Sequence, residues 1–261
     1  MTQTNKKKLS NLLAAAGSIG CFIALWFFAT NGTMLGELIP RPDVVAAAFA
    51  RAIVGKIGKY SLLVHILWSL SRVLIAYVIA AVLGIVLGLA MGWSKAVEAL
   101  FQPLFGIIRP IPPIAWIPIS IIWFGLGETA KYFLIFLAAF SNVTLNAWSG
   151  ARAMDRKLLG AAQMLGANKR QLFLTVVLPS AVPQIFAGLQ IAMSSSWATV
   201  VAAEMVRSSE GVGWIITTGM NNNDVVQILV GIAAIGIVGF ALAIAMRKLE
   251  EVLCKWNKAG R

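Results

Sequence analysis

The chain has 261 residues, of which 59% are hydrophobic and 12% are charged, and its mean hydropathy is +0.82. A soluble globular domain carries about twice that share of charged residues, so the composition excludes this class and predicts an all-α integral membrane protein. The net charge of +12 suits anionic lipid headgroups better than a nucleic acid, because the basic residues cluster beside apolar segments and no polar domain remains to carry a groove.

Six apolar segments have about the 20 residues that a helix needs to cross a bilayer. They cover about 12–30, 62–91, 105–124, 132–148, 185–206 and 225–246. The first is interpreted as an uncleaved helix, because Phe27 and Phe28 stand where a signal-peptide cleavage site needs small residues. Cys21 lies in mid-segment and Cys254 near the end of the chain, so no disulfide or metal site is expected.

Basic residues predict the orientation, since cytoplasmic flanks of membrane helices carry an excess of Lys and Arg. Lys6, Lys7 and Lys8 place the N-terminus in the cytoplasm, and six crossings then place the C-terminus and the loop after the fourth segment on the same side. Both of those stretches are basic. The segment 31–60 is an exception, because it is predicted to lie outside although basic residues outnumber acidic ones in it.

Residues 1–60 form the first predicted division of the chain, with a cytoplasmic tail, the first transmembrane helix and an amphipathic segment. Pro40 and Pro42 interrupt the chain after the first helix. Asp43 is then expected to cap a helix over 44–57 with its charges on one side. Such a helix is predicted to lie along the outer membrane surface.

The second apolar segment is longer than a bilayer requires, so it is expected to tilt or to project. It carries Gly84, Gly88 and Gly92 on one face, and small residues four apart allow close helix packing. The pattern predicts tight packing within the bundle or at a dimer interface; the alternative is that glycine is simply frequent in membrane helices. His65, the only histidine, is interpreted as a packing residue rather than a ligand.

Arg72 lies well inside the second apolar segment, where an arginine is costly unless it is paired or faces water. Glu204, near the end of the fifth segment, is the corresponding acid. If the second segment runs inward and the fifth outward, the two side chains lie at similar depth. We therefore predict that they pair and hold an outer gate of the bundle.

The third apolar segment contains four prolines in nine residues, between Pro110 and Pro118. Each proline removes a backbone donor and displaces the preceding turn, so an undistorted helix is excluded. Irregular backbone in a membrane is tolerated where it is buried in protein or lines a water-filled path. The segment is predicted to line or hinge a translocation path, and the alternative is a kinked structural helix. Its candidate path residues are Arg109, Pro112, Pro113 and Trp116.

The segment 155–183 is the long polar interruption of the apolar pattern. Asp155 is expected to cap an amphipathic helix with apolar positions that include Leu158 and Leu165. Gly166 allows the chain to turn, and Asn168 begins a second helical run through Leu178, which Pro179 is expected to stop. Without further context, this is a loop with two surface helices.

The last third of the chain has two weaker signals. The stretch 208–223 is rich in glycine and polar residues, and is predicted to be an outer loop, with contact to a partner protein as the alternative. Trp214 in it suits a membrane interface. The sixth apolar segment carries Gly231, Gly236 and Gly239, which are expected to be packing positions.

The loop at 155–183 resembles the EAA loop of ABC-importer permeases. The family pattern is Glu-Ala-Ala, three residues, Gly, nine residues, Ile, any residue and Leu-Pro, and the chain has Ala161-Ala162, Gly166 and Val176-Val177-Leu178-Pro179 at those spacings. Gly160 stands in place of the family's Glu, so no charge-based contact is assigned to it. In the family this loop forms a coupling helix held in a groove of the ATPase subunit. The resemblance assigns ATPase coupling to Asp155, Leu158, Gly160, Ala161, Ala162, Leu165, Gly166, Leu178 and Pro179.

Two further motifs, RPIPPIAWIP and WFGLGE, resemble the nitrate, sulfonate and taurine branch of these permeases. The likeness covers roughly 62–250. It implies a six-helix type I importer fold, two permease copies, two ATP-binding cassette subunits and a separate periplasmic or lipid-anchored binding protein. The implied divisions are a transmembrane domain over 61–250, with its cytoplasmic coupling loop at 150–183, and a cytoplasmic tail at 251–261. The implied location is the bacterial inner membrane.

No GxxxxGK[ST] motif occurs, so ATP and Mg²⁺ are expected in the partner ATPase and no cofactor is expected in this chain. Nor is there a nucleophile elbow, an HExxH pair or a His-carboxylate cluster that would indicate a membrane enzyme. An ion-gradient-driven transporter remains an alternative. It predicts paired ionisable residues at mid-membrane and a repeat between the two halves, whereas the apolar segments hold few charges and no repeat is evident. On resemblance alone, taurine or an aliphatic sulfonate is favoured over nitrate as the imported anion.

Overall fold

The structure is a computed structural model, and it describes residues 3–206 and 208–254. It divides into two compact units. Unit 1 comprises Met1–Leu63 and Ile215–Ala233, and unit 2 comprises Val64–Trp214 and Ala234–Arg261. Helices dominate both units, and the described strands are a single short pair in unit 1.

Unit 1 contains three helices and a small hairpin. The elements are α1 (Gln3–Thr30), α2 (Met34–Leu38), α3 (Pro42–Val54), β1 (Lys56–Ile57) and β2 (Tyr60–Ser61), followed later in the chain by parts of α11 (Val212–Asn221) and α12 (Val225–Leu253). The strands are antiparallel, with Ile57 opposite Tyr60, and Gly58 in the turn has a φ of +65°. Glycine adopts that left-handed conformation at little cost.

The helix predicted after Pro42 forms, but its beginning and end differ from the prediction. Asp43 does not cap it: α3 begins at Pro42, with Arg41 as the N-terminal flanking residue, and Asp43 pairs with Arg41 instead. A proline suits the first helical position because its φ is already helical and its missing N–H would have no partner there. The helix ends at Val54 rather than at Ile57, because the next residues enter β1.

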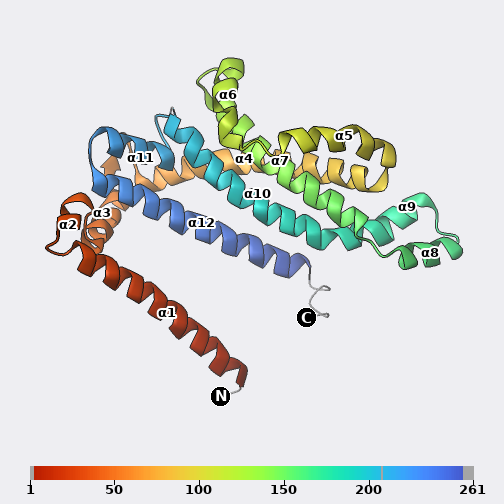
Figure 1. The fold of residues 1–261 in the computed structure, drawn as a ribbon, viewed down its shortest axis with the longest axis horizontal. Coiled ribbons are helices and arrows are strands. Elements are labelled where there is room, and N and C mark those ends of the chain that lie inside the picture. The colour runs from red at the N-terminus through yellow and green to blue at the C-terminus, as the bar shows by residue number, and fades with distance from the viewer. Residues whose placement is uncertain (1–2, 207, 255–261) are drawn as a thin grey trace. The chain divides into compact units, whose positions relative to one another are not determined.

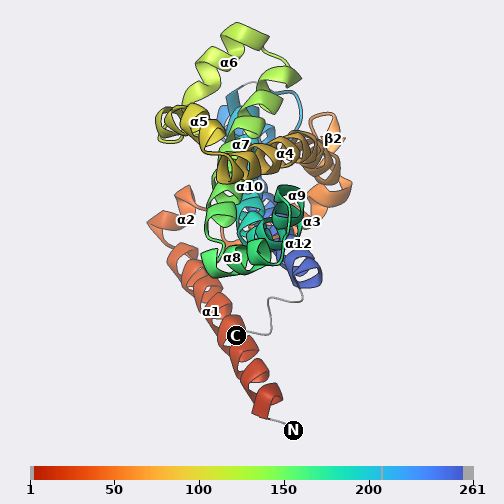
Figure 2. The same cartoon turned by 90° about the vertical axis from the view of Figure 1, so that its right-hand side faces the viewer.

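Unit 2 is a bundle built around α4 (Leu62–Trp93), α7 (Glu128–Arg152) and α10 (Leu178–Val206), which run side by side (Figure 1, Figure 2). Its other elements are α5 (Lys95–Ile108), the 3₁₀ turn η1 (Pro113–Trp116), α6 (Ile117–Phe124), α8 (Arg156–Met164), α9 (Lys169–Leu172) and the π-helical turn η2 (Phe173–Val177). The core where the three long helices meet contains Leu89, Ala147, Ala151, Val177, Ala181 and Ile185.

The glycine face of α4 packs against α7 of the same chain, which confirms the prediction of tight packing within the bundle. A Cβ on Gly88 would lie 2.3 Å from the backbone oxygen of Thr144, and one on Gly92 would lie 2.3 Å from Cβ of Ala151. Real Cβ atoms do not approach other atoms so closely, so these positions require glycine. The dimer-interface alternative is not needed to explain this face.

The described residues contain four helices long and apolar enough to cross a membrane, or up to six spans if each of two bent pairs counts as one. The four are Leu62–Trp93, Glu128–Arg152, Lys169–Val206 and Val225–Leu253. The predicted third segment is discontinuous: α5 ends at Ile108, and its axis makes an angle of 87° with the helix that follows the proline run. The first bent pair, at 97°, joins α1 to α2 and α3.

The prediction that Pro179 ends the second helical run is wrong. The helix continues from Lys169 to Val206, with Pro179 in the first turn of α10 and a π-helical turn, η2, directly before it. A proline clashes with the preceding α-helical turn and removes one of its bonds. The wider π turn accommodates such a local disruption without ending the helix.

The prediction of an outer loop over 208–223 is also wrong for most of that stretch, because 212–221 form α11. Val212, Ile215 and Ile216 are buried at the spacing of one helical face. Trp214 stacks on His65, with ring centroids 5.1 Å apart. Of the sixth-segment glycines, Gly231 and Gly239 pack closely against side chains, whereas Gly236 has open space around it.

Candidate functional site

Three features of unit 2 carry the residues that the sequence singles out: the polar loop between α7 and α10, a buried group of charges, and the break between α5 and α6. We call the first the α8–α9 loop, residues 153–172. We call the second the Arg72 cluster, which contains Arg72, Glu128, Lys131, Glu204 and Glu210. We call the third the proline break, residues 109–116.

The α8–α9 loop begins and turns where its sequence predicts. Asp155 is the N-cap of α8, and its Oδ1 accepts a hydrogen bond from the backbone N–H of Lys157 at 2.8 Å. Gly166 has a φ of +83°, in the left-handed region that favours glycine. Asn168 and Gln171 then form a capping box at the start of α9, with reciprocal bonds of 2.9 and 2.8 Å.

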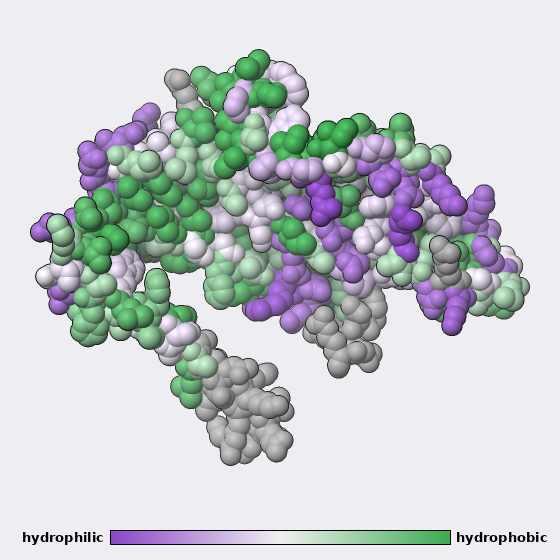
Figure 3. Space-filling model, viewed as in Figure 1, coloured by the Kyte–Doolittle hydropathy of each residue, from purple (hydrophilic) through white to green (hydrophobic). Residues whose placement is uncertain are grey.

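The loop exposes apolar and small side chains. Leu158 is 57% exposed, and Met164 and Leu165 are each 88% exposed. Apart from the adjoining backbone of its own helix, no atom lies within 4 Å of the position that a Cβ on Gly160 would occupy, and the side chain of Ala161 is exposed. Around these residues, hydrophilic side chains gather at the α8–α9 end of the molecule (Figure 3). An exposed apolar group in a polar surrounding is typical of a protein contact site.

Both ends of the loop are anchored in the bundle core. Met154 on one side, and Phe173 and Leu178 on the other, pack against the core cluster where α4, α7 and α10 meet. The Phe173 ring also contacts Trp93 of α4 edge-on, with ring centroids 5.6 Å apart. Leu178 therefore serves as an anchor, while Leu158 and Leu165 stay exposed. The loop is thus joined at both ends to the core formed by three long helices.

An ion pair adds a further link at this end of the bundle. Arg152, in the last turn of α7, pairs with Glu98 in the first turn of α5, and its guanidinium lies over the Trp148 ring at 5.4 Å. Both charges also suit the helix ends at which they stand. The pair thus connects α5, which leads to the proline break, with α7, which leads to the α8–α9 loop.

The structure brings Arg72 and Glu204 together, as the sequence predicts. Arg72 Nη1 lies 2.8 Å from Glu204 Oε1, and both side chains are fully buried. Arg72 also pairs with Glu128 of α7 at 2.6 Å and with Glu210 at 3.0 Å. Lys131 completes the group through a bond of 2.8 Å to Glu128. The cluster joins α4, α7, α10 and the segment before α11.

Glu204 is held by neutral donors as well. Ser69 of α4 lies 2.8 and 2.9 Å from its two carboxylate oxygens, and the backbone N–H of Gly213 donates to Oε2 at 3.0 Å. A Cβ on Gly211, whose φ is +118°, would lie 2.3 Å from the carboxylate carbon. Glycine is therefore required at Gly211 by both conformation and space.

Sequence reasoning missed Glu128, Lys131, Glu210 and Ser69 as members of this cluster. Glu128 ends the WFGLGE motif, and Lys131 follows it by three residues, which places both on one face of a helix. That spacing could have indicated that Glu128 and Lys131 form an ion pair. The contact of Glu210 with Arg72 joins residues 138 positions apart, and no local pattern indicates it.

His65 is a packing residue, as predicted. It is fully buried, its Nδ1 accepts a hydrogen bond from the backbone N–H of Gly211 at 3.1 Å, and it stacks on Trp214. Within residues 3–206 and 208–254, no group of three or more His, Cys, Asp or Glu side chains is arranged to hold a metal ion.

The proline break is separate from the Arg72 cluster in its contacts. Arg109 and Pro112 are exposed, while Pro113 and Trp116 are half-buried in η1, which packs on α7 and α10. Arg109 makes no ion pair with another described residue. The sequence prediction of a distorted segment is confirmed, but Arg109 does not join Arg72.

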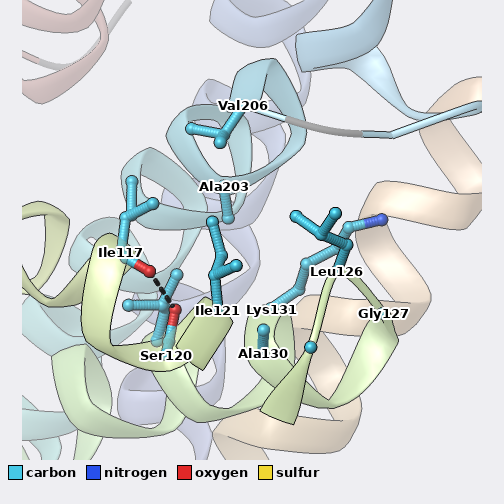
Figure 4. Close-up of a pocket in the computed structure, with 11 residues that line it drawn as sticks. Ile117, Ser120, Ile121, Leu126, Gly127, Ala130, Lys131, Ala203 and Val206 are labelled. Atoms are coloured by element: carbon cyan, nitrogen blue, oxygen red, sulfur yellow. Dashed lines mark hydrogen bonds between the residues drawn. The ribbon is translucent and has the colours of Figure 1, made fainter. Parts of the chain in front are cut away.

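A small cavity of about 20 Å³ lies beyond the break, where α6, α7 and α10 meet (Figure 4). Ile117 and Ile121 of α6 line one side, and Lys131 of α7 and Val206 of α10 line others. Its volume is that of about one water molecule. The cavity borders the Arg72 cluster through Lys131.

Comparison with known proteins identifies the family. Residues 80–253 match the binding-protein-dependent transport system inner membrane component family. The chain belongs to this family. It is therefore an inner membrane component of a transport system, a permease subunit rather than an enzyme, and ATP hydrolysis belongs to a separate subunit.

Three curated relatives cover nearly the whole chain. The taurine transport system permease protein TauC of Escherichia coli is 33% identical, covering 92% of this chain and 88% of the relative. The putative aliphatic sulfonates transport permease protein SsuC of the same organism is 34% identical, with coverages of 91% and 89%. The nitrate import permease protein NrtB of Synechococcus elongatus is 33% identical, with coverages of 90% and 87%.

A solved structure supports the fold. The chain is similar to a chain from the inward-facing MetNI methionine ABC transporter, with a TM-score of 0.58, 18% identity, and coverage of 71% of this chain and 96% of the other. The permease thus has the type I importer fold that the sequence motifs imply, and it is an all-α integral membrane protein.

Proposed function

We propose that this permease imports a small molecule with an anionic sulfonate group, taurine or an aliphatic sulfonate, as part of an ATP-driven transporter. In the proposed assembly two copies of the chain form the membrane part, two ATP-binding cassette subunits hold ATP and Mg²⁺, and a binding protein delivers the anion. The chain itself binds no cofactor. Taurine and sulfonate relatives at 33% and 34% identity support this substrate class. The nitrate relative at 33% identity supports nitrate as the alternative cargo.

The observation that carries the proposal is the α8–α9 loop. Its exposed residues Leu158 and Leu165 offer an apolar contact surface, and the small residues Gly160, Ala161 and Ala162 allow close backbone approach by a partner. Its ends are fixed in the bundle core through Met154 and Phe173. We propose that an ATPase subunit grips this loop, and that ATP-driven closure of the two ATPases moves it together with α4, α7 and α10.

This role requires the loop to lie in the cytoplasm. We propose that the N-terminus, the α8–α9 loop and the C-terminus are cytoplasmic, in accordance with the basic residues beside them. The Arg72 cluster, at the opposite ends of α4, α7 and α10 from the loop, then lies in the outer half of the membrane. We propose that Arg72 and Glu204 hold an outer gate there, and that the proline break lines the path that alternates between the two sides.

The function is tested by expression with an ATP-binding cassette subunit and a binding protein from the same organism, followed by purification and reconstitution into liposomes. We expect the ATPase to co-purify, and uptake of taurine or an alkanesulfonate to require ATP inside the vesicles and binding protein outside. Nitrate is the competing cargo in the same assay. Uptake that follows an imposed proton or sodium gradient without ATP would contradict the proposal and favour a secondary transporter.

A further inference from the structure

The guanidinium of Arg72 has no hydrogen-bond donor left for a new ligand. It carries five N–H groups, and it makes five hydrogen bonds: two to the Glu128 carboxylate at 2.6 and 2.9 Å, one to the Glu204 carboxylate at 2.8 Å, and two to Glu210, through its carboxylate and its backbone oxygen, both at 3.0 Å. An anion that binds Arg72 must therefore replace one of these three acids.

The three acids differ in how firmly they are held. The Glu204 side chain is fully buried and has Ser69 and Gly213 as further donors, and the Glu210 side chain is 19% exposed. The Glu128 side chain is 40% exposed, and its carboxylate accepts from two cations, Arg72 and Lys131. Water reaches Glu128 most easily, so it is the acid that another anion can replace at the lowest desolvation cost.

The backbone before Glu128 has space to move. Glu128 is the first residue of α7 and follows a turn in which Gly125 has a φ of +74°. Positions for a Cβ on Gly125 and on Gly127 have no atom within 4 Å. The cavity at α6, α7 and α10 is lined by both glycines and by Lys131 (Figure 4). The cavity therefore borders the backbone on both sides of Glu128.

We infer that Arg72 and Lys131 form a binding site for a small oxyanion, which the Glu128 carboxylate occupies while no cargo is present. The Nε and Nη2 groups of Arg72 hold Glu128 in the two-pronged arrangement that also suits a sulfonate or another carboxylate. Lys131 supplies the second cation. The choice of a sulfonate as ligand rests on the proposed function. In that function, the site would bind the cargo in the outer half of the permease.

The charge of the cluster is consistent with such an exchange. Arg72 and Lys131 contribute two positive charges, and the three glutamates contribute three negative charges. A monovalent anion that replaces Glu128 leaves the charge of the buried group unchanged. Arg72 also keeps Glu204 and Glu210 as partners throughout, so the exchange never leaves a buried arginine without a counter-ion.

The test is chemical rescue of Glu128→Ala in the full chain, purified into lipid nanodiscs, with methanesulfonate as the probe. The thermal unfolding midpoint is followed as methanesulfonate replaces chloride at constant ionic strength. We expect the variant to unfold several degrees below the unsubstituted permease and methanesulfonate to recover most of that loss in a saturable way. The unsubstituted permease should respond at least tenfold more weakly at the same concentration, since the tethered Glu128 competes at an effective concentration of about millimolar or above.

Two controls separate site binding from a general salt effect. Glu98→Ala removes the partner of an exposed arginine, Arg152, and should show no saturable response. The double variant Glu128→Ala with Lys131→Met should lose the response of Glu128→Ala. If Glu128→Ala does not fold, Glu128→Gln takes its place in the experiment. Glutamine keeps the shape of the side chain but has no negative charge, so calorimetry should detect methanesulfonate binding to this variant.

The inference is overturned if neither Glu128 variant responds to methanesulfonate beyond its response to chloride, or if Glu98→Ala responds equally. The experiment uses the permease without its ATPase, so this failure would leave the proposed transport function standing. Conversely, a failure of ATPase co-purification would not affect an anion site measured in the isolated chain.

Discussion

Neutralising Arg72 gives the sharpest measure of what the buried charge cluster contributes to stability. In the variant Arg72→Gln the Glu204 carboxylate, which is fully buried, loses its only buried cationic partner among the described residues. Glu128 is 40% exposed and retains Lys131, and Glu210 is partly exposed, so water and Lys131 compensate these two acids. Most of the cost therefore comes from Glu204.

Breaking a buried ion pair by removing one partner costs about 3–5 kcal/mol. We expect Arg72→Gln to lower the free energy of unfolding by about this amount, and Glu204→Gln to lower it by less, because Arg72 keeps two other acids. The loss of unfolding free energy in the double variant should be smaller than the sum of the two single losses by at least about 1.5 kcal/mol. The reason is that the second substitution removes the uncompensated charge that the first one leaves.

The assay is denaturant-induced unfolding of the full chain in mixed micelles, followed by Trp fluorescence. Arg109→Gln is the matched control, since Arg109 is exposed and makes no described ion pair, and it should change the free energy of unfolding by no more than about 0.5 kcal/mol. The reasoning is refuted if Arg72→Gln and Arg109→Gln have the same effect, or if the two single effects at Arg72 and Glu204 simply add.

Four further substitutions test the packing and the caps. Gly92→Val should prevent normal packing of α4 on α7, because even a Cβ at this position would lie 2.3 Å from another atom. Its control is Gly106→Ala, which lies in open space on α5 and should be neutral or stabilise by up to about 1 kcal/mol. The yields of folded protein of the two variants are compared by size-exclusion chromatography. Gly211→Ala should destabilise by more than about 2 kcal/mol, since it combines a φ of +118° with a clash on Glu204, and an unchanged thermal midpoint would contradict this. Asp155→Ala should cost about 1 kcal/mol and speed amide exchange in the first turn of α8, and equal exchange rates in both proteins would show that the cap is unimportant.

Local signals in the sequence predict the α8–α9 loop well. The loop has a cap at Asp155, a turn at Gly166 and a capping box at Asn168. Each of these features depends only on residues that are at most three positions apart in the sequence. The proline run predicts the break between α5 and α6 for the same reason, because each ring acts on the turn beside it. Its 87° bend was not predictable, since the angle depends on the helices against which the segment packs.

The wrong predictions have identifiable physical causes. Pro179 does not end its helix because the π-helical turn η2 lies directly before it and accommodates the disrupted backbone bond. The polar residues from Thr217 to Asn223 led to the prediction of a loop. Val212, Ile215 and Ile216 nevertheless form the buried face of a helix, α11. For α11, the burial of one helical face outweighed the polar composition of the stretch.

The Arg72 cluster was predictable only in part. An arginine within an apolar helix requires a partner, and Glu204 was the acid at the corresponding depth, so that pair follows from the cost of a buried charge. Glu128 and Glu210 reach Arg72 across 56 and 138 positions of sequence. Such contacts depend on how the helices pack, which a single sequence does not specify.

The central claim is that the α8–α9 loop is where an ATPase subunit engages the permease. Site-specific photo-crosslinking in cells that express the whole transporter tests it most directly, with the probe at Leu165, which is 88% exposed on the loop, or at Met220, which is 55% exposed on α11. We predict a crosslink to the ATPase from Leu165 and none from Met220. No ATPase crosslink from Leu165, or equal crosslinking from both positions, would contradict the proposed function.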